Sequence, residues 1–365
     1  MNALSLLFTL STACDGTGKL HGTDSADTGD TAAAIDSGDS ADTNDTNDSG
    51  DTGEETNPYA DNDGDGLPDA WANADYWASG PLSSLILPTE LPTATHWEVR
   101  VATSADGVAW VPDERVIAWG ISSLDLLVAG DTLVIAGMID GEAARELPPD
   151  VQGYTIPALA TTDLLTWGSK TWTITGGNDT NLVDPSLQLG SDGLLRAAWF
   201  AHSEPGVDPA TIEGVHNMQR GTWSETGTFA QDDADPEYAY EWLVDPVICE
   251  LGETQWLFYT NLAERVYAAH SPDGGEHFDM EASFSWEGPS VPFCISGDDD
   301  IRVIGQTPAG KDAPLQGILT TDGTFTETGP LYAEHPWGEN CTSPVLGYWK
   351  DQWVLACAVQ VKGDE

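Results

Sequence analysis

The chain has 365 residues and a formal net charge of −49, from 61 acidic and 12 basic side chains. This charge argues against nucleic acid and anionic membrane surfaces as partners. The 38 Gly and 22 Pro residues, together with 15 Trp, are typical of many short strands joined by tight turns. A chain of this length can hold one large all-β domain besides shorter segments.

The first 14 residues form an apolar run that ends in small residues and Cys14. The run is too short to be a transmembrane helix. It resembles the signal peptide and lipobox of a bacterial lipoprotein, in which Cys14 would be lipidated and become the mature N-terminus. No Lys or Arg precedes the run and Ser11 stands where Leu is usual, so a truncated or misassigned start is the alternative. The resemblance implies an exported protein at the outer membrane or cell surface, held to the membrane only by this lipid.

Residues 15–58 consist largely of Asp, Thr, Ser, Gly and Asn. Such a segment has too little apolar surface to offset the entropy of ordering, and its charges repel one another. The composition predicts a disordered linker that lifts a folded domain away from its anchor.

A calcium-loop segment is expected at residues 59–75. Carboxylates at alternate positions, followed by a Gly that permits a sharp turn, are what a Ca²⁺ loop requires. The expected ligands of a structural Ca²⁺ ion are Asp61, Asp63, Asp65 and Asp69. The twelfth position is Ala72 rather than Glu, so the segment is not a complete EF-hand and instead resembles the calcium loops of thrombospondin type 3 repeats. The alternative is that it is the last acidic piece of the linker.

A repeat begins near residue 96 and continues to residue 365. Two near-identical segments, LVDPSL at 182–187 and LVDPVI at 243–248, each precede a polar turn and an apolar strand. Self-similarity at a fixed period indicates a repeat architecture. Five second strands are predicted, each with a first strand before it: Thr132–Met138, Leu194–Phe200, Gln255–Thr260, Asp300–Gln306 and Gln352–Val359.

A second motif recurs at the far end of these units. Residues 271–278 match the Asp-box pattern S-x-D-x-G-x-x-(W/F) of sialidase-like propellers, and shortened relatives occur at 104–110, 161–167 and 320–325. The Asp accepts backbone N–H groups and the Gly supplies a positive φ, so these turns are expected to be structural.

The box at 104–110 precedes any complete unit, and the last unit ends without one. The strands around Val99–Trp110 can therefore complete the blade begun by Ser343–Val359, which closes the ring and removes exposed sheet edges. The predicted fold is an all-β, five-bladed β-propeller closed by N-terminal strands, spanning residues 96–365, and we expect a monomer.

Four cysteines, Cys249, Cys294, Cys341 and Cys357, lie in the last three units and fit an exported, disulfide-permissive compartment. Four cysteines allow three pairings. We favour Cys249–Cys294 between neighbouring inner strands and Cys341–Cys357 within the last blade. A four-cysteine metal site is the alternative.

Three acids occur in consecutive units, Asp184 and Asp245 before Pro and Glu287 before Gly-Pro. This order resembles the glycoside hydrolases with five-bladed propellers, the arabinanase and β-xylosidase group. The resemblance implies that Asp184 is the general base, that Asp245 tunes pKa and orientation, and that Glu287 is the general acid. Glycoside cleavage needs one carboxylate held ionised and one held protonated across the bond.

The chain departs from that pattern, because a whole unit precedes Asp184 and about a dozen residues separate Glu287 from its partner strand. Glu287 could instead end the outer strand of the preceding blade. Glu250 is then a substitute acid and Asp125 a substitute base. A further alternative is that Asp-Pro only starts each inner strand, with Asp capping the turn.

Two other functions remain open. A sialidase-like exo-glycosidase would hold the substrate carboxylate with three arginines, for which Arg196 and Arg302 are candidates together with Arg265 or Arg100. A non-catalytic carbohydrate-binding or adhesion propeller needs only aromatic faces for sugar rings. The candidates for such faces are Tyr240, Trp242, Trp337 and Trp349. In every case a glycan or polysaccharide is the expected partner.

Overall fold

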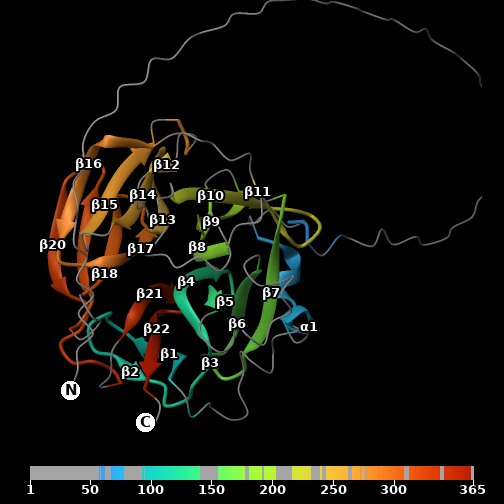
Figure 1. The fold of residues 1–365 in the computed structure, drawn as a ribbon. Coiled ribbons are helices and arrows are strands. Elements are labelled where there is room, and N and C mark those ends of the chain that lie inside the picture. The colour runs from blue at the N-terminus through green and yellow to red at the C-terminus, as the bar shows by residue number, and fades with distance from the viewer. Residues whose placement is uncertain are drawn as a thin grey trace, which may run out of the picture. The chain divides into compact units, whose positions relative to one another are not determined.

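The computed structural model describes the chain from residue 57 to residue 362, with gaps (Figure 1). The gaps are residues 58, 62–66, 78–92, 94, 140–154, 177–180, 191–192, 203–215, 232–238, 241–243, 262–264, 272, 276–277, 308–311 and 338–340. All described residues belong to one compact unit, residues 54–365. Cys14, the expected linker up to residue 56, and Asp63 and Asp65 therefore lie outside the described residues.

The described strands form antiparallel meanders of four strands each. The first is β4 (Ile121–Ala129), β5 (Thr132–Ile139), β6 (Thr155–Thr161) and β7 (Gly168–Thr175). The second is β8 (Asn181–Leu189), β9 (Leu195–His202), β10 (His216–Trp223) and β11 (Phe229–Gln231). The third is β13 (Val244–Leu251), β14 (Thr254–Asn261), β15 (Arg265–Ser271) and β16 (Asp279–Glu287). The fourth is β17 (Ser290–Ser296), β18 (Asp300–Gln306), β19 (Leu315–Thr320) and β20 (Phe325–Pro330).

The fifth meander joins the two ends of the repeat region. Its strands are β21 (Thr342–Trp349), β22 (Gln352–Val361), β1 (His96–Ser104) and β2 (Val111–Pro112). β1 pairs with β22 over its whole length, from His96 opposite Val361 to Ser104 opposite Trp353. The expected completion of the last blade by N-terminal strands is therefore present. Two short strands, β3 (Ala118–Trp119) and β12 (Ala239–Tyr240), pair with β1 and β10.

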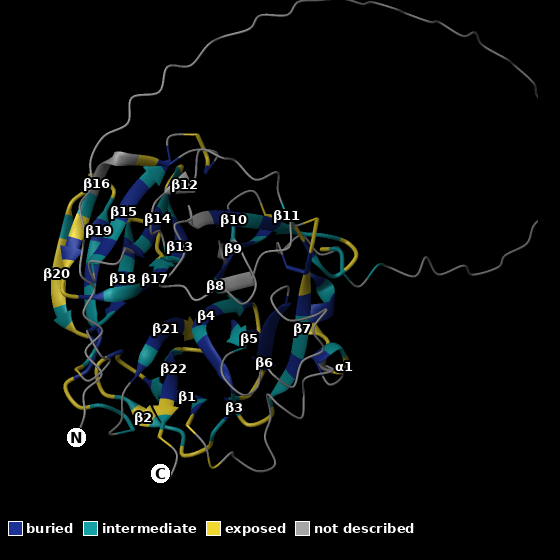
Figure 2. Ribbon diagram, viewed as in Figure 1, coloured by how far each residue is buried: buried dark blue, intermediate teal, exposed yellow. Residues whose placement is uncertain are grey.

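The first strand of each meander faces a common centre. β4, β8, β13, β17 and β21 each contact the first strands of two other meanders, so that these strands form a ring. This arrangement is propeller-like and agrees with the predicted all-β propeller fold. Burial differs between inner and outer strands. β6, in the interior of its meander, is buried throughout, whereas the outer strand β20 is largely exposed (Figure 2).

An aromatic cluster joins the first two meanders at their outer edge. There β7 and β11 pair in parallel, with Phe229 opposite Ile174, which merges the two meanders into one sheet. A 3-10 helix (Asp69–Ala72) and α1 (Ala74–Trp77) lie against this seam (Figure 1). The Trp71 ring stacks on that of Trp172, with centroids 4.7 Å apart and planes 4° from parallel. The segment before β1 is therefore part of the folded unit.

The structure contains the two disulfides that we favoured. Cys249 of β13 pairs with Cys294 of β17, which links neighbouring meanders, and Cys341 pairs with Cys357 within the fifth meander. Within the described part of the chain, no helix is long and apolar enough to cross a bilayer.

Candidate functional site

A bulge recurs at the same place in the first strand of every meander. At each bulge the register with the second strand shifts, and one non-glycine residue has a left-handed φ between 46° and 52°. These residues are Ser123, Asp184, Asp245, Val291 and Ser343. Asp tolerates this conformation better than most residues, whereas a β-branched residue such as Val291 is strained there. The ring of bulges turns selected side chains toward the centre.

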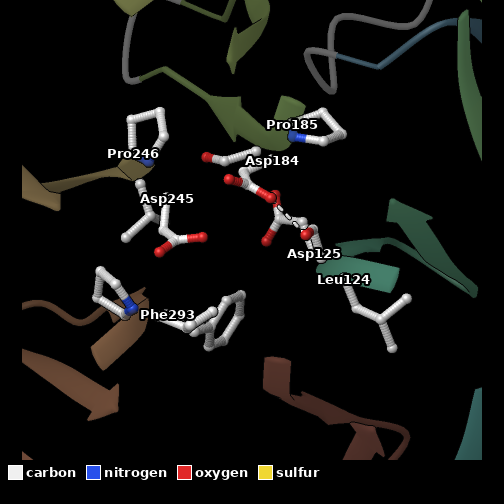
Figure 3. Close-up of a pocket in the computed structure, with 12 residues that line it drawn as sticks. Leu124, Asp125, Asp184, Pro185, Asp245, Pro246 and Phe293 are labelled. Atoms are coloured by element: carbon white, nitrogen blue, oxygen red, sulfur yellow. Dashed lines mark hydrogen bonds between the residues drawn. The ribbon is translucent and has the colours of Figure 1, made fainter. Parts of the chain in front are cut away.

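A pocket lies where four of these bulges meet, on β4, β8, β13 and β17. The enclosed cavity is small, about 20 Å³, and the surrounding space reaches about 290 Å³ only when the open solvent at the mouth is included. Three aspartates line it, Asp125, Asp184 and Asp245, together with apolar groups such as Phe293 (Figure 3). We call this the central pocket. The repeated Leu-Val-Asp-Pro segment thus supplies two of its three carboxyl groups.

Asp184 and Asp245 interact directly. Burial, together with the charge of Asp184 and a hydrogen bond shared with it, raises the pKa of Asp245 well above the usual value for a carboxyl group. The Thr260 hydroxyl also bonds to Asp245, and its oxygen accepts the Val291 N–H at 2.8 Å. The Ser123 hydroxyl donates to Asp184 Oδ1. Two carboxylates in contact do not both ionise readily, so the pair retains a proton to higher pH than a lone Asp.

Asp125 is the most buried of the three aspartates, and only 3% of this residue is exposed. One carboxylate oxygen accepts the Leu126 N–H at 2.8 Å, and the other accepts the Leu187 N–H from β8. Burial raises the pKa of Asp125 to about 7 despite these two donors. Asp125 therefore fixes β8 against β4 at the wall of the central pocket, and both of its oxygens are already occupied by backbone groups.

Glu287 does not meet the aspartates. It ends β16, the outer strand of the third meander, where its side chain is 73% exposed and pairs with Arg265 at 2.9 Å. The expectation that it follows Asp184 and Asp245 into one site is not met, since Gly288 and Pro289 form the turn that leads to β17 after it. Glu250, the substitute acid, does not line the central pocket either. Its side chain accepts a hydrogen bond from Gln255 Nε2 at 3.0 Å.

The arginines proposed for a sialidase are dispersed. Arg100 lies on β1 beside Glu98, Arg196 on β9, Arg265 on β15 and Arg302 on β18 over the Trp353 ring. None of them lines the central pocket. The structure therefore offers no three-arginine cluster there to hold a substrate carboxylate.

Two of the four aromatic residues proposed as sugar-binding faces, Trp337 and Trp349, pack in or against the hydrophobic core. Trp349 is 3% exposed, donates from Nε1 to the Asp131 carbonyl at 3.1 Å and carries Lys350 over its ring. Trp337 packs against the main hydrophobic core. Trp242 and the side chain of Tyr240 lie outside what the structure describes. Trp349 is therefore a packing residue and not an exposed sugar-binding face.

The calcium prediction falls mostly outside the described residues. Asp61 and Asp69 are described, but residues 62–66, with Asp63 and Asp65, are not. Among the described residues, no group of three or more His, Cys, Asp or Glu side chains is arranged to hold a metal ion. The calcium loop stays a prediction.

Comparison with known proteins gives structural likenesses only. No protein-family model and no curated protein matches this chain. Similar solved structures include a thermostable family-43 glycoside hydrolase, with 9% identity, 67% of this chain and 91% of that chain covered, and a TM-score of 0.49. They also include an α-L-arabinofuranosidase from Lactobacillus brevis (9% identity, 67% and 86% covered, TM-score 0.49) and an endo-1,4-β-xylanase from Bacteroides thetaiotaomicron (12%, 66% and 84%, TM-score 0.48). At such identities and TM-scores, these likenesses say nothing about the activity of this chain.

Proposed function

We propose that this chain is a glycan-recognising propeller that binds a sugar at the mouth of the central pocket through Asp184 and Asp245. The observation that carries the proposal is the direct contact of these two carboxyl groups at the pocket. The proton of the pair lies in the bond between the two carboxyl groups, and their remaining lone pairs are acceptors for the hydroxyl groups of a sugar.

The same geometry favours binding over hydrolysis. The carboxyl groups of an inverting glycosidase are about 6.5–9.5 Å apart and those of a retaining one about 5–5.5 Å. Asp184 and Asp245 are in hydrogen-bond contact, so they do not stand on opposite sides of a glycosidic bond. Asp125 has both oxygens on backbone N–H groups, and Glu287 lies on an outer strand.

The test is a binding assay with the full chain on three soluble polysaccharides, xylan, arabinan and galactan. We expect at least one to bind, with affinity reduced at least tenfold by Asp184→Asn and by Asp245→Asn. Glu287→Gln is the matched control and should bind like the wild type, since Glu287 is an exposed acid on β16. Failure of the wild type to bind any of the three would overturn the proposal.

Release of reducing sugar is measured in the same samples. Binding without release supports a recognition protein. Release that depends on Asp184 and Glu287 would replace the proposal with hydrolysis by the acids that the sequence first indicated. Circular dichroism of each variant shows whether loss of binding reflects loss of the fold.

We also propose that the protein is exported and anchored through a lipid on Cys14, with a Ca²⁺ loop before the propeller. The apolar run at residues 1–14 and the pairing of all four propeller cysteines support export. Labelled fatty acid should be incorporated in the wild type and not in Cys14→Ala. The Ca²⁺ loop predicts that Ca²⁺ raises thermal stability in the wild type and not in Asp63→Asn/Asp65→Asn.

A further inference from the structure

A second cleft lies between the third and fourth meanders, away from the central pocket. It has a cavity volume of about 400 Å³ and shares no lining residue with the central pocket. Trp256 of β14, His270 of β15 and Phe284 of β16 form one side, and the turn at Thr321 and Asp322, between β19 and β20, forms the other. We call this the side cleft. Its size is that of a small-molecule site.

The aromatic side of the side cleft is a continuous surface. Trp256 and His270 are directly opposite each other on paired strands, with ring centroids 5.4 Å apart. Phe284 lies 6.3 Å from Trp256 and stacks at 4.7 Å on Phe325, the first residue of β20. The Phe284–Phe325 stack ties the two meanders together beside the cleft, so the cleft is already formed in the folded protein. Partly exposed aromatic rings offer faces on which the C–H groups of a sugar can pack.

The polar groups of the side cleft complement that surface. His270 Nδ1 is buried and has no hydrogen-bond partner in the described part of the chain, which is unfavourable unless a ligand or water satisfies it. Asp322 Oδ1 accepts the Thr320 hydroxyl at 2.7 Å and the Thr324 N–H at 3.0 Å, and these bonds lower the pKa of Asp322. Its carboxylate is therefore ionised at neutral pH and is a strong acceptor for hydroxyl groups.

We propose that the side cleft binds a sugar residue, which stacks on Trp256 and bonds through its hydroxyl groups to Asp322 and His270. An aromatic face, an ionised acceptor and an unsatisfied imidazole nitrogen in one cleft match a neutral, hydroxyl-rich ring better than an anion, which Asp322 would repel. This site goes beyond the central pocket. Together the two sites would let one chain hold a long glycan at two points, which strengthens binding without new contacts at either site.

The experiment uses xylan, arabinan and galactan on the full-length double variant Asp184→Asn/Asp245→Asn, in which the central pocket is disabled. We expect residual binding of at least one polysaccharide. Adding Trp256→Ala or Asp322→Asn should weaken this binding at least tenfold. Asp322→Asn keeps the Oδ1 acceptor that holds the turn, so it tests the charge with little effect on the fold.

The matched control is Asp163→Asn. Asp163 occupies the corresponding turn of the first meander, where its Oδ1 accepts the Thr166 N–H at 2.7 Å, and it lines neither site. It should leave binding unchanged. His270→Gln is a further test variant. The Gln amide reproduces only part of the imidazole geometry, so this variant should bind several-fold more weakly.

The two proposals fail in different ways. If wild-type binding is lost with Trp256→Ala but unchanged in Asp184→Asn/Asp245→Asn, the side cleft stands and the central pocket does not. If the double variant binds none of the three polysaccharides, or if Trp256→Ala and Asp322→Asn leave its binding within twofold, the side cleft is overturned. Thermal unfolding of every variant separates lost binding from lost folding.

Discussion

Asp184 and Asp245 occupy the same bulge position on neighbouring strands, β8 and β13, and share a hydrogen bond across the central pocket. Each has a left-handed φ, 51° for Asp184 and 52° for Asp245, and each is followed by Pro. The sequence repeat therefore places two carboxyl groups in contact, and the contact raises the pKa of Asp245, so that the pair keeps one proton.

Stability should depend on pH through Asp125. Its pKa is raised to about 7 by burial, so the folded state holds a proton that the unfolded state has released above about pH 4. This contribution to stability is complete below about pH 4 and is lost as the pH rises through about 7. Relative to Asp125→Asn, the wild type should lose on the order of 1–4 kcal/mol of unfolding free energy between these limits. Urea unfolding at several pH values measures it.

The control for this pH effect is Asp322→Asn. The pKa of Asp322 is lowered, so its contribution is present above about pH 4 and is lost only as the pH falls further. The difference between this variant and the wild type should stay constant from pH 5 to pH 8. A constant difference for Asp125→Asn over that range would contradict the assignment of a raised pKa.

Replacing Val291 with Gly should stabilise the protein. Val291 has a φ of 46°, which is strained for a β-branched residue, and Gly relieves this strain. The relief of about 1–3 kcal/mol exceeds the extra unfolded-state entropy of Gly, about 0.5–1 kcal/mol. We expect a net gain of about 1 kcal/mol in chemical unfolding. Val244→Gly, at a half-buried strand position without a positive φ, should instead destabilise, and the prediction is wrong if both variants lose stability equally.

Trp71→Ala should destabilise the whole unit. Trp71 is 2% exposed and lies among Trp77, Trp172 and Trp223 at the β7–β11 seam. Truncation of a buried Trp costs about 3–5 kcal/mol. Tyr348→Ala, at a residue 53% exposed, is the control and should cost much less. If Trp71→Ala melts with the wild type, the segment before β1 contributes nothing to the stability of the propeller.

Loss of the two disulfides should have unequal effects. Cys249 and Cys294 are 45 residues apart in sequence, against 16 for Cys341 and Cys357. Each typically contributes about 2–4 kcal/mol, and the longer loop should add about 1 kcal/mol more through the entropy of the unfolded chain. Paired Cys→Ala variants are compared by urea unfolding. Equal losses for the two pairs would indicate that effects in the folded state dominate.

Much of the fold could be predicted because it is repeated. The two Leu-Val-Asp-Pro segments mark β8 and β13, and an unmatched turn at 104–110 indicates that early strands complete the last meander. The position of Glu287 could not be read in the same way. An acid before Gly-Pro can either open an inner strand or end the outer strand before it, and only the pairing of Arg265 with Glu287 along β15 and β16 decides between them.

Asp125 shows a second limit of prediction from the sequence. Its unit has Ser-Leu-Asp where the next two units have Asp-Pro, so its acid falls two residues after the bulge instead of at it. An acid inside the apolar run of β4 was the available signal. Whether it faced solvent, the pocket or a backbone donor depended on the approach of Leu187 from β8, which local sequence does not encode.

The pairing of β1 with β22 also sets an order of events during synthesis. β1 is translated before the other described strands, and its partner β22 is translated after them. Until then the nine residues His96–Ser104 present an unpaired strand edge, which is a template for pairing with other chains. A nascent chain therefore stays vulnerable to aggregation at this edge until β22 has been made. Factors that shield extended segments during folding should matter more for this protein than for one whose sheets close locally.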